Sequence, residues 1–261
     1  MPRTTINGAE LYYAEGGAGD PPIVFVHGWT CDHTYFAPQF EHFGRSHQVV
    51  SVDLRGHGQS DKPLEDYAMA ALADDVATLA AELKLNHPVV VGHSMGGIVA
   101  LEAAARHRDA FGAVVLVDSP VLVSDATRDA LSEFIAALRQ PAYQETQRGF
   151  CASALFAPFD DPDVKERVLD AMGSCPQHVM ASCFEQLFAW DGAVAAAGAK
   201  IPVLFISANA TVADLVRFKE LCPQLVTGQT VGAGHFNQLL VPEQVNAMIQ
   251  QFLVTALSPK S

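Results

Sequence analysis

The chain alternates between short, purely apolar runs and longer stretches in which apolar and polar positions recur with a helical period. A short, uninterrupted apolar run is typical of a strand that is buried on both faces of a parallel sheet. Runs of this type, rich in valine and isoleucine, occupy residues 23–26, 49–52, 89–91, 114–117 and 203–206. These runs predict the central strands of a sheet.

Stretches with helical periodicity separate these strands, at residues 67–83, 95–107 and 211–221. Strands that alternate with helices form βαβ units, in which the strands are parallel. Two further strands are expected at 4–6 and 10–14, because Asn7-Gly8 between them is a strong hairpin signal. We therefore predict an α/β fold with a mostly parallel sheet that is flanked by helices.

Residues 122–190 interrupt this alternation, because they contain no apolar run of the buried-strand type. Helices are expected there instead, with Asp125 as the first N-cap and Asp161 or Asp163 as the second. They are placed at residues 126–138, 164–172 and 177–189. The sequence thus predicts a core made of residues 1–121 and 191–261, with a helical insertion at 122–190.

The composition is that of a globular protein, with 49% apolar and 17% charged residues. The 16 basic and 29 acidic residues give a formal net charge of −13. This balance argues against a nucleic-acid partner, since binding to phosphates requires clustered lysine and arginine. No apolar run approaches the roughly 18–20 residues of a membrane span, so none is expected.

The cysteines and the first residues bear on the cellular location. The five cysteines are odd in number and include no C-x-x-C pair, which favours reduced, buried thiols. The N-terminal residues contain no apolar segment of the kind found in a secretory signal. We therefore expect a cytoplasmic protein. The sequence does not specify an oligomeric state.

The motif Gly92-His93-Ser94-Met95-Gly96 follows one of the apolar runs and opens a helical stretch. A G-x-S-x-G sequence in this context predicts a nucleophile elbow, a sharp turn from strand to helix that exposes the serine hydroxyl. The glycines are needed because a side chain on either would clash across the turn. Ser94 is therefore the candidate nucleophile.

With this motif the chain resembles the serine esterases and lipases of the α/β-hydrolase fold superfamily. Three further sequence blocks carry the resemblance: V-H-G-W at 26–29, D-L-R-G-H-G-Q-S at 53–60 and G-A-G-H-F at 232–236. The resemblance implies an eight-stranded, mostly parallel sheet and a catalytic triad in the order Ser, Asp, His. It also identifies the helical insertion at 122–190 with the cap, or lid, of that family.

The resemblance also implies the roles of the residues around the nucleophile. His235, in the Gly-rich block after the β-rich run 226–231, is the expected general base. The backbone amide of Met95, directly after the nucleophile, is one expected oxyanion donor, and that of Trp29 is the other. No metal or organic cofactor is needed by this chemistry.

The acid of the triad departs from the commonest family pattern. Many members carry an aspartate a few residues after the seventh strand, where this chain has Thr211. We predict that Asp118 takes this role, because it ends the preceding strand and both strand ends open on the same face. Asp214, or a dyad without an acid, remains the alternative.

Aromatic residues of the insertion are candidates for substrate binding. Together with Trp29, the predicted binding residues are Phe134, Phe159, Phe188 and Trp190. An aromatic-rich lid suits an apolar or aromatic small-molecule ester. For any single residue, packing of the cap against the core is the competing interpretation.

The leading hypothesis is a serine hydrolase of carboxylic esters. A cofactor-independent dioxygenase or a C–C bond hydrolase of the same fold is the first alternative, since some such dioxygenases take their acid from the end of strand six. A ligand-binding signalling protein that retains the triad is the second. Haloalkane dehalogenases and epoxide hydrolases are disfavoured, because these relatives carry an aspartate where this chain has Ser94.

Overall fold

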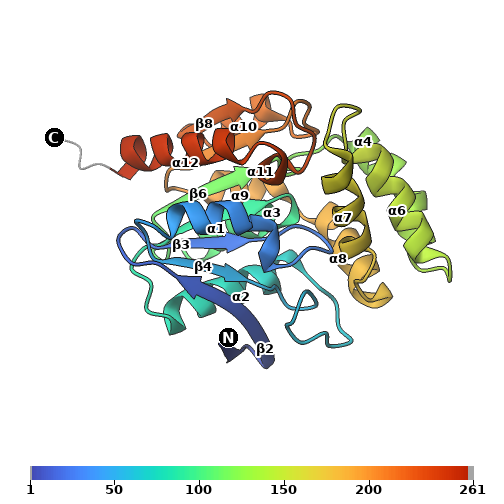
Figure 1. Cartoon of the computed structure of the whole chain (residues 1–261), viewed down its shortest axis with the longest axis horizontal. Coiled ribbons are helices and arrows are strands. Elements are labelled where there is room, and N and C mark those ends of the chain that lie inside the picture. Colours follow the sequence, from blue (N-terminus) through green and yellow to red (C-terminus); the bar gives the residue numbers. More distant parts are fainter. Residues whose placement is uncertain (1, 258–261) are drawn as a thin grey trace.

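The computed structural model describes residues 2–257. Within that range one eight-stranded sheet runs through the molecule, in the order β1-β2-β4-β3-β5-β6-β7-β8 (Figure 1). The strands are β1 (Arg3–Ile6), β2 (Ala9–Gly16), β3 (Ile23–Val26), β4 (Val49–Val52), β5 (Val89–His93), β6 (Ala113–Val117), β7 (Val203–Ser207) and β8 (Leu225–Gln229). β3 to β8 are parallel, which confirms the predicted fold class.

The antiparallel edge of the sheet begins with the predicted hairpin. β1 pairs with β2, and β2 pairs with β4, both in antiparallel register. Asn7 and Gly8 have φ angles of 46° and 84°, the left-handed values that a tight two-residue hairpin turn requires. The local Asn-Gly signal was therefore sufficient to place this turn.

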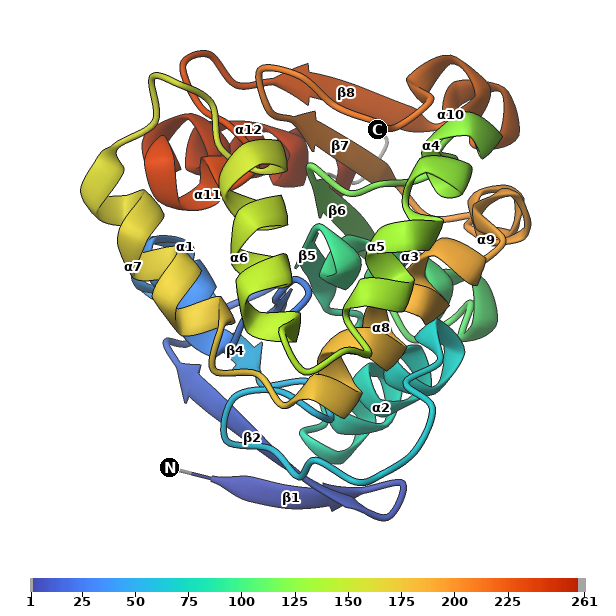
Figure 2. The same ribbon diagram turned by 90° about the vertical axis from the view of Figure 1, so that its right-hand side faces the viewer.

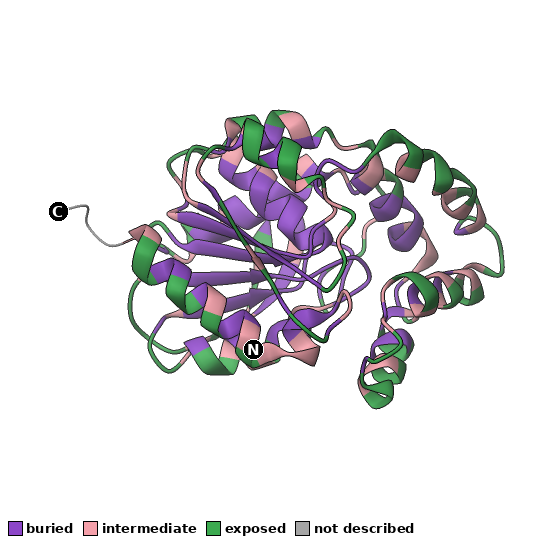
Figure 3. Ribbon diagram, turned by 90° about the horizontal axis from the view of Figure 1, so that it is seen from above, coloured by how far each residue is buried: buried purple, intermediate pink, exposed green. Residues whose placement is uncertain are grey.

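Both faces of the central parallel strands, β3 to β7, are buried, with successive residues packing on opposite sides, whereas the edge strand β8 is mostly exposed. Val90 of β5 belongs to one apolar cluster, whereas Val89 and Val91 belong to the other. α2 (Met69–Glu82), α3 (Met95–Arg106) and α10 (Leu215–Leu221) contribute to the first cluster, while α1 (Ala37–Phe43) and α12 (Pro242–Leu257) contribute to the second. The strands are accordingly buried along their length in Figure 3.

Five helices between β6 and β7 lie beyond the carboxyl ends of the parallel strands (Figures 1 and 2). We call them the cap helices: α4 (Asp125–Ala130), α5 (Ser132–Ala137), α6 (Tyr143–Ala154), α7 (Pro162–Met172) and α8 (Gln177–Ala189). The next helix, α9 (Gly192–Gly198), packs against α3 of the core instead. All five cap helices thus fall within residues 122–190.

The cap is where helix prediction was least accurate. The single helix expected at 126–138 is broken into α4 and α5, and Ser124, rather than Asp125, caps the first. Of the two candidates Asp161 and Asp163, Asp161 caps α7. α8 has the predicted bounds. α6 was not predicted, because most of its residues, Y-Q-E-T-Q-R-G-F-C-A-S-A, are polar or small.

Several short elements of the core were also missed. They are the 3-10 helix η1 (His33–Phe36), α1, α9 and α11 (Asn237–Leu240). Between residues 2 and 257, no helix is both long enough and apolar enough to cross a membrane.

Candidate active site

Ser94 lies at the turn between β5 and α3, with backbone angles of φ 52° and ψ −120°. A positive φ is costly for a residue with a side chain, so the surrounding structure must hold it. The Ser94 N–H donates to the carbonyl oxygen of Val117 at 2.9 Å, which ties the turn to the end of β6. This strained strand–turn–helix geometry matches the predicted nucleophile elbow.

The two outer glycines of the motif allow the turn to close. A Cβ atom on Gly92 would lie 2.1 Å from the Gly96 carbonyl oxygen, and one on Gly96 would lie 2.1 Å from the Val26 carbonyl oxygen. Both atoms belong to the backbone and have little room to move. These positions therefore require glycine because of close packing around Ser94, as the sequence spacing indicated.

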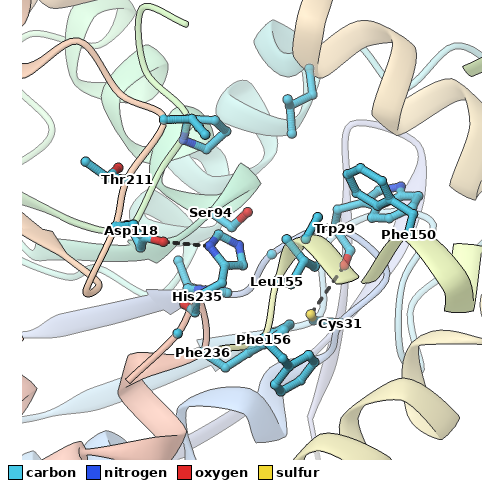
Figure 4. A pocket seen from close by; sticks show the side chains of 18 of the residues that line it. Trp29, Cys31, Ser94, Asp118, Phe150, Leu155, Phe156, Thr211, His235 and Phe236 are labelled. Carbon is cyan, nitrogen blue, oxygen red and sulfur yellow. Dashed lines mark hydrogen bonds and ion pairs between the residues drawn. The ribbon is translucent and has the colours of Figure 1, made fainter. Parts of the chain in front are cut away.

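His235 and Asp118 form a hydrogen-bonded pair beside Ser94. The distance from His235 Nδ1 to Asp118 Oδ2 is 2.8 Å, and the imidazole lies between the carboxylate and Ser94 in Figure 4. Only 6% of Asp118 is exposed. The structure thus brings together the three residues that the sequence proposed as a triad.

Backbone contacts fix Asp118 at the end of β6. Its N–H donates to the Ile206 carbonyl oxygen at 2.8 Å, and its Oδ1 accepts from the Ala208 N–H at 3.0 Å. Asp118 also has a positive φ, 43°. The backbone of Asp118 is thereby held by β7 and one carboxylate oxygen by the residue after β7, while the other carboxylate oxygen faces His235.

The alternative acid, Asp214, has a different task. Its side chain accepts from the Arg217 N–H at 3.0 Å and so provides the N-cap of α10. Thr211, at the position where many relatives carry the acid, lines the cavity described below. The geometry therefore favours Asp118 over Asp214 as the partner of His235.

His93 holds the backbone of the candidate base. Its Nε2 lies 2.9 Å from the His235 carbonyl oxygen, and because a carbonyl can only accept, Nε2 carries the proton. Burial, together with the neighbouring His235, sets the pKa of His93 well below its ordinary value. His93 is thus a neutral donor that holds the loop of His235.

The loop after β3 passes directly beside the nucleophile. A Cβ atom on Gly28 would lie 3.2 Å from the Cβ of Ser94, so the backbone directly before Trp29 is close to the nucleophile. His27 shapes this loop through bonds to the Gly28 carbonyl oxygen at 2.8 Å and the Leu54 N–H at 3.0 Å. Met95 begins α3, where the backbone N–H has no acceptor within the helix.

A cavity of about 450 Å³ opens above Ser94, between the core and the cap helices. Its wall is mainly apolar; the larger side chains include Trp29, Phe150, Leu155, Phe156, Phe184 and Phe188. No lysine or arginine is among the described residues that line it. Such a cavity can enclose an uncharged organic molecule next to the Ser94 hydroxyl.

The structure places two of the predicted substrate-binding side chains, Trp29 and Phe188, on the cavity wall. The other three are not among the residues that line the cavity. Phe134 packs behind the wall against Phe150, at 4.2 Å between ring centroids. Phe159 is 55% exposed, and the Trp190 indole donates to Glu102 Oε2 at 2.9 Å. Composition alone cannot distinguish aromatic residues that line the cavity from those that pack behind its wall or are exposed to solvent.

Other wall residues were not predicted. Cys31, Leu155 and the loop residues 209–212 all line the cavity. The loop could have been inferred, because it follows β7 and parallel strands place their following loops at one edge. Cys31 and Leu155 carry no signal in the sequence, since their position depends on how the cap folds over the core.

One cluster of potential metal ligands lies outside the cavity: Asp32, His33 and Asp53 have candidate ligand atoms within 4.8 Å of one another. The backbone and side chain of His33 bind Asp53 Oδ1, at 2.6 and 2.8 Å. Asp32 Oδ1 accepts from the Thr34 N–H. These bonds join the loop after β3 to Asp53, the first residue of the 53–60 block, and they account for the cluster as a structural element.

Fold and site together match the nucleophile-elbow arrangement of the α/β-hydrolase fold. The chain belongs to the α/β hydrolase fold family, which it matches over residues 21–161. It is 41% identical over 117 residues to an AB hydrolase superfamily protein of Bacillus subtilis, a match covering 44% of this chain and 41% of that protein. It is 36% identical over 129 residues to the 2-(acetamidomethylene)succinate hydrolase of Mesorhizobium japonicum, covering 49% and 46% respectively.

A solved structure is similar over almost the whole chain. The enol-lactonase of Burkholderia xenovorans is 25% identical, with a TM-score of 0.87 and coverage of 97% of this chain and 100% of that one. By contrast, the sequence matches to the two curated relatives span less than half of the length of each. Family membership is thus shown, while the reaction must be argued from the site.

Proposed function

We propose that the protein is a serine hydrolase that cleaves carboxylic esters through an acyl-enzyme. The observation that carries the proposal is the 2.8 Å hydrogen bond between His235 Nδ1 and Asp118 Oδ2, next to a serine held at φ 52°. A nucleophile, a base and a carboxylate that orients the base are the parts that acyl transfer requires.

In the acylation step His235 Nε2 takes the proton of the Ser94 hydroxyl, and Ser94 Oγ bonds to the carbonyl carbon of the ester. Asp118 keeps the imidazole oriented and stabilises the imidazolium that forms. The amides of Met95 and Trp29 donate to the oxyanion. When the intermediate collapses, the C–O bond to the alcohol breaks, and the alcohol leaves with the proton from Nε2.

Deacylation repeats the sequence with water. His235 removes a proton from a water molecule, the resulting oxygen attacks the acyl carbon, and Ser94 Oγ regains its proton as the acid leaves. Atoms and charge balance without any further reactant, so the proposed mechanism uses neither metal nor organic cofactor.

The substrate class follows from the wall of the cavity. Residues 122–190, which we propose to act as the cap, supply apolar side chains such as Phe150, Leu155 and Phe188. A charged acyl group would lose its hydration without gaining a cationic partner, and this is costly. We therefore propose that the substrate is an uncharged, apolar or aromatic ester. A succinate such as the one named for the Mesorhizobium relative would find no cationic side chain among the described residues of this wall.

The test is turnover of p-nitrophenyl esters of increasing acyl length, combined with labelling by a fluorophosphonate probe. We expect both activities in the wild-type protein and a loss of both in Ser94→Ala. Ester turnover that persists in Ser94→Ala would overturn the proposal.

The position of the acid is also compatible with two other reaction classes. A carboxylate after β6 that orients a histidine would also suit abstraction of a proton from a heteroaromatic substrate by a cofactor-independent dioxygenase, and a C–C bond hydrolase could use the same triad. Oxygen consumption with quinolone-type substrates would favour the former. Slow turnover with one retained product would instead favour the ligand-binding protein. The cytoplasmic location and the absence of a nucleic-acid partner stay predictions.

A further inference from the structure

The loop between α6 and α7 of the cap contacts the loop that carries His235. The His235 N–H donates to the Leu155 carbonyl oxygen at 3.0 Å, and the Gly234 N–H donates to Asp160 Oδ1 at 2.8 Å. Phe156 stacks on Phe236, with 5.2 Å between ring centroids. Three consecutive residues around the candidate base are therefore attached to the cap.

Asp160 is the polar centre of this contact. It is buried, with 9% exposed, and both of its carboxylate oxygens accept from backbone N–H groups. Oδ1 accepts from Gly234, while Oδ2 accepts from Ala157 at 2.7 Å. The second bond holds the carboxylate within its own loop, so that the first can hold the loop of the base. A charge-assisted bond of this kind is stronger than a neutral one.

Gly234 is shaped to accept this carboxylate. A Cβ atom on Gly234 would lie 2.4 Å from Asp160 Oδ2 and 2.9 Å from the Ala157 backbone nitrogen. Its φ is not in the left-handed region, so the need for glycine here arises from the approach of the cap rather than from a turn.

We propose that Asp160 is a positioning residue for His235, a role that rests on the proposed esterase function. His93 holds the His235 carbonyl oxygen from the core, and the cap holds the two N–H groups at Gly234 and His235 from the other side. The imidazole can then reach Asp118 and Ser94 at the same time. Loss of the Asp160 bond frees one side of this loop.

The proposal links substrate binding to the base. Leu155, Phe156 and Ala157 line the cavity and belong to the loop that Asp160 stabilises. A substrate that packs against these residues presses on the segment that orients His235. The cap thereby contributes to the chemical step as well as to the walls of the cavity.

The direct test compares Asp160→Asn with Asp161→Asn. The asparagine offers one acceptor oxygen, so one of the two backbone N–H groups loses its partner. Asp161, the N-cap of α7, is the matched control, because it is an adjacent aspartate without a bond to the His235 loop, and asparagine caps helices equally well. We expect kcat for a p-nitrophenyl ester to fall about tenfold or more in Asp160→Asn, with KM nearly unchanged, since small misplacement of a catalytic group costs rate.

A purely structural role would instead lower Tm and alter KM together. The proposal is overturned if Asp160→Asn has the kcat of Asp161→Asn, or loses activity only in parallel with Tm. If Asp160→Asn does not fold, Gly234→Ala disturbs the same bond from the other side. It should then show the same selective loss of kcat, and normal kcat in Gly234→Ala would equally overturn the proposal.

A second readout separates this proposal from the esterase function. The His235 Nδ1 proton bonded to Asp118 should give a downfield NMR resonance. We expect this resonance to broaden or shift in Asp160→Asn and to persist in Asp161→Asn and Ser94→Ala. If the wild type shows no turnover that depends on Ser94, the proposed esterase function is wrong. The resonance still tests whether Asp160 positions His235. An unchanged resonance in Asp160→Asn would overturn that role.

Discussion

The carboxyl ends of the parallel strands and the cap helices both border the cavity, but different interactions fix the side chains of each region. In the core, backbone bonds to strand ends place the reacting groups, as when Ser94 N–H donates to Val117 and Asp118 N–H donates to Ile206. In the cap, α4 and α5 have no buried residue at all, and aromatic packing supports the wall. Figure 3 shows the same contrast between buried strands and partly exposed outer helices.

This difference separates two tasks. Chemistry requires groups fixed to within a fraction of an ångström, which a sheet and its close-packed turns provide. Selection of a substrate requires only a wall of suitable shape, which helices with weaker packing can supply. Hydrogen bonds join the two regions at several points; for example, the Trp29 indole donates to the Met180 carbonyl oxygen at 2.8 Å, and Asp160 Oδ1 accepts from the Gly234 N–H at 2.8 Å.

The largest effect should come from the acid on the core side. In Asp118→Asn the amide no longer stabilises an imidazolium and can favour the wrong tautomer of His235, so we expect kcat to fall about a thousandfold or more. Asp214→Asn, which changes only the N-cap of α10, should retain nearly full activity. Steady-state kinetics on both variants checks this, and the reverse order would assign the acid to Asp214.

Stability toward acid should also depend on the core. His27, His57 and His93 are each 1% exposed, and burial lowers the pKa of each, that of His57 to about 3. In the unfolded chain their pKa is about 6.5. Below that pH the unfolded state binds protons that the folded state does not, so stability falls by up to ~1.4 kcal/mol per pH unit for each histidine.

Urea unfolding at a series of pH values between 7.5 and 5 measures this loss. We expect the free energy of unfolding to decrease steadily toward the acid end in the wild type and in His42→Gln, whose side chain is exposed. His57→Gln should show a shallower decrease. A stability that does not change over this range would contradict the neutral, buried state of these histidines.

The smallest effect should come from the cap wall. Phe150→Ala removes a ring that lines the cavity and stacks on Phe134, so kcat/KM for esters with long or aromatic acyl groups should fall about tenfold. Phe159→Ala is the control, because this ring is 55% exposed and does not line the cavity. Equal losses in the two variants would mean that the cavity wall does not select the acyl group.

The sequence predicted the core well because its signals are local. A purely apolar run indicates a strand, Asn7-Gly8 indicates a hairpin, and the spacing of Gly92 and Gly96 around Ser94 indicates a tight turn. The placement of Asp118 beside His235 needed one further step, the rule that parallel strands end at one edge. Each of these inferences uses residues that are close in sequence or in sheet order.

The cap could not be predicted in the same detail. α6 contains few large apolar residues, and whether an aromatic ring faces the cavity depends on contacts between distant segments. Phe134 and Phe150 look equivalent in the sequence, yet Phe150 alone of the two lines the cavity. The bond from Asp160 to Gly234 spans 74 positions, and only the folded chain brings these residues together.

The measurement that tests the central claim most directly is mass spectrometry of the protein quenched during turnover of a p-nitrophenyl ester. We expect an acyl group on the peptide that contains Ser94, and none on the corresponding peptide of Ser94→Ala. Turnover with no covalent acyl group on Ser94, or with the group on another residue, would contradict the proposed mechanism.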